Sequence, residues 1–329
     1  MQTSPVAYVG VDIAKDTFDA CLMRPVGKPQ RKQFDNTPGG FGKLVRWAEH
    51  LASDIPCHYC MEATGPYWRA LAEALAEADK QVSVVNPFLV RHAALGSGQI
   101  NKTDSADALA IADYCRKEQP ALWRICAPEI RQLVAYLRRL ESLKCQRTAE
   151  LNRQQEPGQD KEVLGSIKRM LGVVDAEIAR VEALIRKHID NHPRLKEDAE
   201  LLESIPGIAG LTAAWLIAEL GDVSSYVNAK SAAAYVGLAP AIYQSGTSVK
   251  RPTRINKRGR QYLRKALYMP ALAAIRFNPI VRTFYERLVS GGMARKAGVA
   301  AVMRKLVMIS YGILKSRHKF TEQPAQPAA

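Results

Sequence analysis

Four acidic residues in the chain have the types and spacing of a metal site: Asp12, Glu62, Asp104 and Asp107. Asp12 and Glu62 each end an apolar run, so their carboxylates meet if the two runs are neighbouring strands. Asp104 and Asp107 begin a helical pattern and project from one helical face. Acids gathered at one point repel unless a divalent cation lies between them, and hard oxygen ligands suit Mg²⁺ or Mn²⁺. The set predicts a metal site that binds phosphate oxygens.

A second candidate group lies far along the chain, where hydroxyl side chains stand beside a glycine. Ser245, Thr247 and Ser248 flank Gly246. The cations that follow are Lys250, Arg251, Arg254, Lys257, Arg258, Arg260, Arg264 and Lys265. A hydroxyl attacks only when its proton is taken or its pKa is lowered, and nearby cations neutralise phosphate. The segment predicts attack on a phosphodiester by one of three hydroxyls, with the cations binding the nucleic-acid backbone.

The acids must be positioned by the first third of the chain. Residues 6–35 have the pattern of three short strands, and residues 57–61 and 82–85 of two more, with helical patterns between them. An antiparallel start followed by alternating helix and strand predicts a mixed sheet flanked by helices, in the order of a ribonuclease H-like domain. A further helix opens at residues 101–107, with Thr103 as its N-cap.

The middle of the chain has the apolar period of long amphipathic helices. A 3-4 spacing runs through Leu164, Ile167, Leu171, Val174, Ile178, Val181, Ile185 and His188. A similar stripe starts near Ile130, and Glu156-Pro157-Gly158-Gln159 separates the two. The pattern predicts an antiparallel coiled-coil hairpin. So narrow a stripe requires a partner, which is either the other arm alone or a second subunit.

The last third is predicted to be mostly helical. Residues 202–213 have the pattern of a helix-hairpin-helix element, in which a Gly-bearing turn offers N–H groups to a phosphate. A plain helix–helix corner that needs glycine explains the same residues equally well.

Charge distribution points to a polyanionic partner. The 329 residues carry a formal net charge of +15. Residues 1–120 have 13 Lys and Arg against 14 Asp and Glu, whereas residues 226–320 have 19 against one, Glu286. A basic bias confined to one region favours nucleic acid. The sequence shows no signal peptide and no apolar run of about 18 residues, so we expect a cytoplasmic protein with no membrane partner.

The cysteines suggest a different metal only weakly. Cys57-His58-Tyr59-Cys60 has a zinc-like spacing, but no second Cys/His pair follows at ligand distance. The tetrapeptide also lies in a strand-like apolar run. We therefore expect buried thiols there.

Several motifs, in one order along nearly the whole chain, resemble those of a known family. Those with the acids are Gly10-Val11-Asp12-Ile13-Ala14-Lys15, Met61-Glu62-Ala63-Thr64-Gly65 and Asn101-Lys102-Thr103-Asp104-Ser105-Ala106-Asp107-Ala108. The others are Ile205-Pro206-Gly207-Ile208, Ala234-Tyr235-Val236-Gly237-Leu238-Ala239-Pro240, Gln244-Ser245-Gly246, Arg254-Ile255-Asn256-Lys257-Arg258-Gly259 and Leu263-Arg264-Lys265-Ala266-Leu267-Tyr268. The chain resembles the DEDD insertion-sequence transposases, a family related to the Piv DNA invertase and now known as RNA-guided bridge recombinases. Val11 and Asn256 depart mildly from the family pattern, which has Ile and often Ser there.

The resemblance implies a fold of mixed class, α/β followed by all-α. It implies a RuvC-like domain over residues 1–125, a coiled-coil hairpin over 126–198, and a mostly helical transposase domain over 199–320. A disordered tail would follow over 321–329.

The resemblance also implies the chemistry and the partners. Ser245 would attack DNA to give a covalent phosphoserine, and only the Ser-Gly match selects it over Thr247 and Ser248. A structured bridge RNA made by the element would pair separately with target and donor double-stranded DNA in a prokaryotic, nucleoid-associated complex. The active form would be a tetramer of two dimers, with one subunit's carboxylates beside another's serine.

Two other functions are compatible with the same residues. One is a metal nuclease of the junction-resolvase kind, in which water attacks and Ser245 only binds. The other is a basic architectural protein whose acids are ordinary surface groups.

Overall fold

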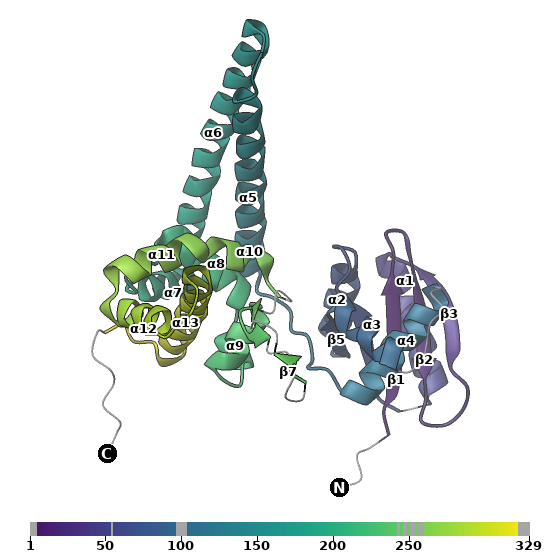
Figure 1. The fold of residues 1–329 in the computed structure, drawn as a ribbon. Helices are drawn as coiled ribbons and strands as arrows, with labels where there is room; N and C mark the ends of the chain where they lie inside the picture. Colours follow the sequence, from purple (N-terminus) through teal and green to yellow (C-terminus); the bar gives the residue numbers. More distant parts are fainter. Residues whose placement is uncertain are drawn as a thin grey trace, which may run out of the picture. The chain divides into compact units, whose positions relative to one another are not determined.

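A computed structural model describes residues 5–53, 55–96, 104–241, 244–245, 249–250, 254–255 and 259–321 (Figure 1). The side chains at 95–96, 104–106, 241, 244–245, 249–250 and 254 are outside this description. Two compact units make up the chain, Met1–Ile125 and Cys126–Ala329.

Unit 1 is built on a five-stranded mixed sheet. Its strands are β1 (Ala7–Ile13), β2 (Thr17–Met23), β3 (Gln30–Asp35), β4 (Cys57–Glu62) and β5 (Gln81–Val85). They lie in the order β3-β2-β1-β4-β5, with β1–β2 and β2–β3 antiparallel and β1–β4 and β4–β5 parallel. This is the ribonuclease H-like arrangement predicted from the sequence, which the structure confirms.

Alternating side chains along the strands lie on the two faces of the sheet, and different helices cover these faces. The helices are α1 (Pro38–Ala52), α2 (Trp68–Glu77), α3 (Pro87–Gly96) and α4 (Asp104–Glu118). Odd-numbered residues of β1 and β4 such as Val11 and Met61 pack with Leu44 of α1 and Leu71 of α2. Even-numbered Cys60 packs with residues of α4 instead. Because side chains alternate along a strand, even-numbered acids on β1 and β4 must also lie on the α4 face.

Unit 2 begins with two long helices, α5 (Pro128–Gln154) and α6 (Lys161–Asp190). Three contacts show that they run antiparallel. His188 Nε2 is 2.8 Å from the carbonyl of Glu129, Lys144 Nζ is 3.0 Å from Glu182, and Arg147 Nε is 2.6 Å from Asp175. The predicted helical hairpin is therefore present, and its turn contains Gly158 at φ +77°.

The rest of unit 2 is a helical bundle with four very short strands. Its helices are α7 (Pro193–Glu203), α8 (Gly210–Leu220), the 3₁₀ turn η1 (Val223–Ser225), α9 (Ala229–Tyr235), α10 (Gln261–Ala266), α11 (Tyr268–Phe277), α12 (Pro279–Ser290) and α13 (Arg295–Ser316). α8 is central, because its residues from Thr212 to Leu220 are all buried.

The sequence predicted no segment long and apolar enough to span a membrane, and one helix contradicts this prediction. α13 passes that test by length and composition, and 56% of its apolar window is buried inside the protein. Val302, Leu306 and Val307 are fully buried in the core of unit 2. Core packing within the bundle therefore explains why this helix is apolar.

Candidate active site

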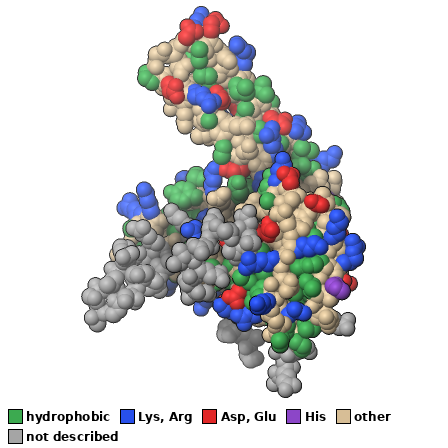
Figure 2. Space-filling view, turned by 90° about the vertical axis from the view of Figure 1, so that its right-hand side faces the viewer, with side chains coloured by type: hydrophobic (Ala, Val, Ile, Leu, Met, Phe, Trp, Pro, Cys, Tyr) green, Lys and Arg blue, Asp and Glu red, His purple; other side chains and the backbone are tan. Residues whose placement is uncertain are grey.

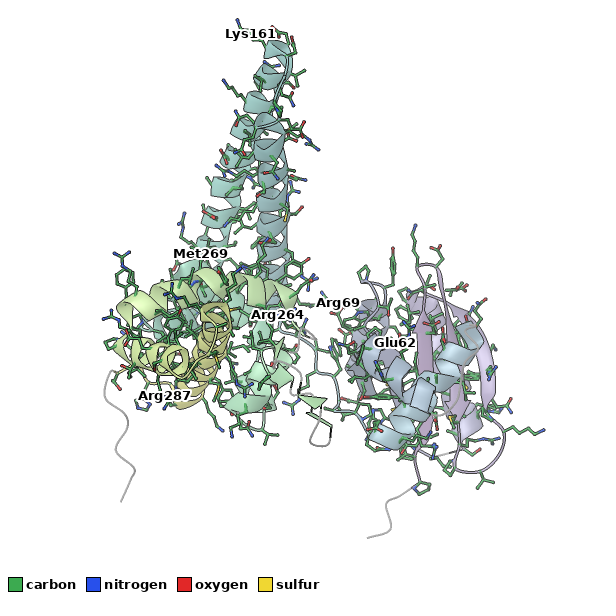
Figure 3. The ribbon with its side chains drawn as sticks, in the orientation of Figure 1. Glu62, Arg69, Lys161, Arg264, Met269 and Arg287 are labelled. Carbon is green, nitrogen blue, oxygen red and sulfur yellow. The ribbon has the colours of Figure 1, made fainter. Side chains whose placement is uncertain are left out.

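Two of the predicted acids lie side by side at one edge of the sheet. The parallel pairing of β1 with β4 places Val11 beside Met61, so Asp12 and Glu62 are the next residues along their strands. Neighbouring strands lie about 4.8 Å apart. Both carboxylates are half-buried on the α4 face, and Glu62 (labelled in Figure 3) accepts a hydrogen bond of 3.5 Å from Thr64 Oγ1.

The start of α4 is held at the same end of β1. A Cβ on Gly10 would overlap the carbonyl of Ala108 and would lie 2.9 Å from the Cα of Ala112, so only glycine allows this approach. Gln119, which follows α4, donates a hydrogen bond of 2.6 Å to the hydroxyl of Tyr8. The helix therefore runs antiparallel to β1, with its first turn toward Asp12.

Asp104 and Asp107 lie on that first turn of α4. The side chain of Asp107 is half-buried, whereas that of Asp104 is outside the described residues. Among the side chains that the structure describes, no three His, Cys, Asp or Glu are arranged to hold a metal ion, so Asp12, Glu62 and Asp107 do not form such a group. The acids thus share one end of β1, β4 and α4. This hard-oxygen donor set fits a divalent cation in type.

A further acid, Asp19, lies beside Asp12, and the sequence analysis missed it. The antiparallel register of β1 and β2 pairs the two residues directly, so their Cβ atoms are about 5 Å apart on the α4 face. Asp19 Oδ2 accepts a hydrogen bond of 3.2 Å from Gln33 Nε2 on β3. The available signal was the alternation of Thr17 to Leu22, which makes Asp19 polar on the same face as Asp12. We call Asp12, Asp19, Glu62 and the first turn of α4 the acidic edge.

Ser245 lies in four short strands that form two pairs, one inside the other along the chain, and we call them the serine hairpin. Its strands are β6 (Pro240–Ala241), β7 (Gln244–Ser245), β8 (Val249–Lys250) and β9 (Arg254–Ile255). β6 pairs with β9, and β7 pairs with β8 so that Ser245 faces Val249 along the backbone. The predicted Arg251, Lys257 and Arg258, and the rival nucleophiles Thr247 and Ser248, lie outside the described residues.

Three described side chains join the end of the serine hairpin to the bundle, and we call them the hairpin clamp. Glu219 is only 5% exposed on the otherwise apolar α8. Arg260 Nε lies 3.4 Å from Glu219 Oε2 and donates a hydrogen bond of 2.8 Å to the hydroxyl of Tyr235. The guanidinium also stacks on that ring, 4.9 Å from its centroid. A buried carboxylate is costly unless it is paired, so the clamp requires all three groups.

Backbone packing reinforces the clamp. A Cβ on Gly259 would overlap the carbonyl of Tyr235 and lie 2.7 Å from the amide of Gly237. The chain that leaves the serine hairpin therefore lies directly against the end of α9. The family-like motif around Gly259 thus has a packing reason that its sequence alone did not show.

The two remaining described cations of the predicted nucleic-acid set also have partners within unit 2. Arg264 (labelled in Figure 3) donates a hydrogen bond of 2.9 Å to the carbonyl of Val236, and burial lowers the pKa of its guanidinium. Lys265 pairs with Glu141 of α5, and this hydrogen bond raises the pKa of the lysine. Nucleic-acid binding by these residues stays a prediction.

The zinc-like tetrapeptide is part of the core of unit 1. Cys60 is fully buried beside Cys115 of α4, and His58 Nε2 is 2.8 Å from Ser83 Oγ. The hydrogen bond with the Cys115 thiol, and then burial, raise the pKa of Cys60 far above its ordinary value. All six cysteines are free thiols.

The fold and the site define a protein with a ribonuclease H-like sheet, acids at one end of neighbouring strands, and a helical unit. Residues 199–286 match the family described as "Transposase IS116/IS110/IS902 family", and residues 9–156 match the IS110 DEDD family described as "Transposase". The chain belongs to the IS110/IS116/IS902 family of DNA transposases and recombinases. Membership of a DEDD family indicates dependence on a divalent metal.

Two relatives that are similar in sequence support this assignment. The chain is 35% identical over 318 residues to the "Pilin gene-inverting protein" of Moraxella bovis, covering 96% of this chain and 98% of that protein. It is 29% identical over 153 residues to an IS110 protein of 43.6 kDa from Streptomyces coelicolor, covering 46% of this chain and 36% of that one. A RuvC structure from Thermus thermophilus is 18% identical, with a TM-score of 0.27, over 35% of this chain and 98% of that chain.

Proposed function

We propose that the protein is an RNA-guided DNA recombinase that works through a covalent phosphoserine at Ser245. The observation that carries this proposal is the acidic edge, where Asp12 and Glu62 share one register position under a helix that Gly10 allows to approach. Asp104 and Asp107 complete the proposed set at the start of that helix. Together these acids would hold Mg²⁺ or Mn²⁺, which supplies charge neutralisation at the scissile phosphate.

The proposed chemistry exchanges one phosphodiester for another and needs no nucleotide cofactor. In the proposed composite site, a carboxylate from the acidic edge of one subunit takes the proton of another subunit's Ser245 as the serine Oγ attacks phosphorus. The bond from phosphorus to the leaving sugar oxygen breaks, and that oxygen leaves as a hydroxyl after taking a proton. A sugar hydroxyl of the partner strand then attacks the phosphoserine, rejoins the DNA and restores the Ser245 hydroxyl.

The serine would be positioned by the hairpin clamp. Because Glu219, Tyr235 and Arg260 fix the end of the serine hairpin on α8 and α9, the Ser245 backbone is tied to the rigid core of unit 2. Arg260 would then act on the reaction through this support. We propose Lys250, Arg251, Arg254, Lys257 and Arg258 as phosphate-binding residues.

The partners proposed are double-stranded target and donor DNA and a structured bridge RNA. The charge balance of residues 226–320, 19 cations against one acid, supports a nucleic-acid partner for this region. We further propose that α5 and α6 pair with another subunit as a coiled coil to build dimers and a tetramer, acting in the cytoplasm on the nucleoid. A resolvase-like metal nuclease, in which water replaces Ser245, is the competing mechanism.

A plasmid strand-exchange assay with purified protein and co-expressed RNA tests the proposal. We expect Ser245→Ala and Asp12→Ala each to abolish exchange, whereas Thr247→Ala and Ser248→Ala retain it. Full exchange by either of the first two variants would remove the serine–carboxylate mechanism. Metal-dependent nicking that survives in Ser245→Ala would instead support the nuclease.

A further inference from the structure

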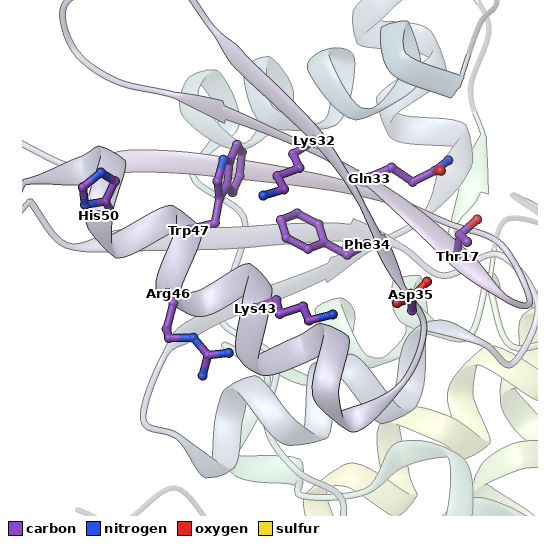
Figure 4. A pocket seen from close by; sticks show the side chains of 9 residues that line it. All are labelled: Thr17, Lys32, Gln33, Phe34, Asp35, Lys43, Arg46, Trp47 and His50. Carbon is purple, nitrogen blue, oxygen red and sulfur yellow. The ribbon is translucent and has the colours of Figure 1, made fainter.

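A basic and aromatic groove lies at the β3 edge of the sheet, between β3 and α1 (Figure 4). Its volume is about 620 Å³. The residues that define what we call the β3 groove are Lys32, Phe34, Lys43, Arg46, Trp47 and His50. No role in the proposed recombination chemistry draws on it.

Two elements form this groove, with side chains at helical spacing on α1 and side chains of the edge strand β3. On α1, Lys43, Trp47 and His50 recur at helical spacing and therefore line one face of the helix. On β3, Phe34 is buried and packs edge-on against Trp47, with ring centroids 5.6 Å apart. Trp47 is thereby held in place while it still lines the groove. The result is a fixed aromatic surface with cations around it.

Within the described part of unit 1, the cations of the groove differ from Arg116 and Lys117 of α4 in having no acidic partner at ion-pair distance. Among the residues that the structure describes, no carboxylate lies within ion-pair distance of Lys32, Lys43 or Arg46. By contrast, Arg116 and Lys117 of α4 both pair with Asp113, at 2.7 and 2.6 Å. One carboxylate, Asp35, also lines the groove, so three cations against one acid leave it with a net positive charge, which favours an anionic ligand. Figure 2 shows Lys and Arg side chains beside hydrophobic and acidic ones on one face of the protein.

The groove adjoins the acidic edge through one row of the sheet. Asp12 pairs with Asp19, and Asp19 accepts the hydrogen bond of Gln33, which lines the groove on β3. Two strand spacings, about 10 Å, therefore separate Asp12 from the β3 edge. Asp12 and Asp19 lie on the α4 face, whereas Phe34 and Trp47 lie on the α1 face, so a strand bound at both places would pass around the β3 edge.

We propose that the β3 groove binds an unpaired nucleic-acid strand. Lys43, Arg46 and Lys32 contact its phosphates, and a base stacks on Trp47. Interleaved cations and a rigid aromatic ring are the features that bind single strands without sequence preference. A duplex keeps its bases stacked inside, so Trp47 selects an unpaired segment. The strand is either RNA or DNA, because both offer the same phosphates and bases.

Photocrosslinking of the full-length protein tests this site. The probes are short single-stranded RNA and DNA oligonucleotides and a DNA duplex, each carrying 5-iodouracil, and crosslinked peptides are mapped by mass spectrometry. We expect a crosslink in the α1 peptide that contains Trp47. Crosslinking with RNA alone assigns the groove to a guide RNA and with DNA alone to a DNA strand, and both support the proposal. Crosslinks confined to other peptides, or α1 crosslinks made only by duplex DNA, would overturn it.

A matched pair of variants supplies the second measurement. Lys43→Gln/Arg46→Gln and Arg116→Gln/Lys117→Gln remove the same charge from exposed positions of unit 1. The first pair should abolish the α1 crosslink and reduce the dependence of log Kd on log salt by about 1.4, because each phosphate contact contributes about 0.7 for single strands. The second pair should change neither. Equal effects of the two pairs would show that only overall charge matters.

These experiments can reject the groove proposal and the recombination mechanism independently of each other. Ser245→Ala should lose strand exchange and keep the α1 crosslink. Loss of the α1 crosslink from the wild-type protein while Ser245-dependent exchange persists would reject the groove alone.

Discussion

The acidic edge and the serine hairpin are positioned by different kinds of interaction. In the acidic edge, backbone register places Asp12 beside Glu62 and Asp19, and a glycine lets α4 lie on β1. In the serine hairpin, close backbone packing at Gly259 is supplemented by the side chains of Glu219, Tyr235 and Arg260. Most single side-chain substitutions leave strand register unchanged, whereas any one substitution in a clamp of three side chains removes part of it. The acids should therefore tolerate neighbouring substitutions that the serine does not.

Gly10→Ala is expected to have the largest effect, because position 10 is where α4 packs too closely on β1 for any side chain. The new Cβ would overlap the Ala108 carbonyl, and backbone on both sides leaves no flexible atom to move. We expect a loss of about 3 kcal/mol in the free energy of unfolding of unit 1 and no strand exchange. Chemical denaturation followed by tryptophan fluorescence measures the first quantity.

The control for this substitution is Gly42→Ala in α1. Its Cβ would meet only Arg46 Nη1, at 3.7 Å. The variant should be as stable as the wild type or slightly more so, since alanine favours a helix by about 1 kcal/mol over glycine. If both variants unfold alike, close packing at Gly10 does not set the position of α4.

Glu219→Gln tests the clamp-based region. Neutralising the buried carboxylate leaves Arg260 without its charged partner, and Arg260 is partly exposed, so we expect about 2 kcal/mol of destabilisation. Strand exchange should fall more than tenfold even at temperatures where the protein is folded. Glu182→Gln breaks a more exposed pair with Lys144 on the helical hairpin and should leave exchange unchanged. Equal losses in both variants would mean that the clamp does not position Ser245.

Asp19→Asn tests the role of Asp19, the acid that was recognised only in the structure, apart from the acids predicted from the sequence. Asparagine keeps the size and the bond to Gln33 but removes a negative charge beside Asp12. We expect exchange to fall about tenfold, or about 1.4 kcal/mol in activation free energy, with a higher Mg²⁺ requirement and an unchanged unfolding midpoint. Asp16→Asn, in the exposed turn before β2, serves as the control. An unaltered Mg²⁺ titration would exclude Asp19 from the metal environment.

Lys265→Gln should have the smallest effect. The pair with Glu141 links α10 to α5 at the surface, and such pairs contribute less than about 1 kcal/mol. Because the folded state raises the pKa of Lys265, the stabilisation is complete below the pKa of the unfolded lysine, about 10.4. It is lost as pH rises through the folded value. Wild type and variant should therefore differ at pH 8 and converge at high pH; a difference independent of pH would contradict this assignment.

Much of the acidic edge could be predicted from the sequence because strand ends are visible there. The apolar runs before Asp12 and Glu62 define two strands, and alternation defines their faces. Asp19 was missed because its partnership depends on the register set by the turn between β1 and β2, and one residue of shift would turn it to the other face. The strand order itself followed from the order of local patterns.

The clamp was hidden for a different reason. Arg260 and Glu219 are far apart in sequence, and a run of cations gives no sign of which member folds back on a buried acid. α13 shows the converse problem, because burial in a bundle and burial in a membrane select the same apolar composition. In both cases the missing information was long-range packing.

The most direct test of the central claim is to trap the covalent intermediate. A donor DNA with a nick beside the cleavage position loses its short leaving strand, so the phosphoserine cannot be reversed. The account predicts a protein–DNA adduct on denaturing gels whose phosphorylated residue is Ser245, and no adduct with Ser245→Ala or Asp12→Ala. Strand exchange without any adduct, or an adduct at Thr247 or Ser248, would contradict it.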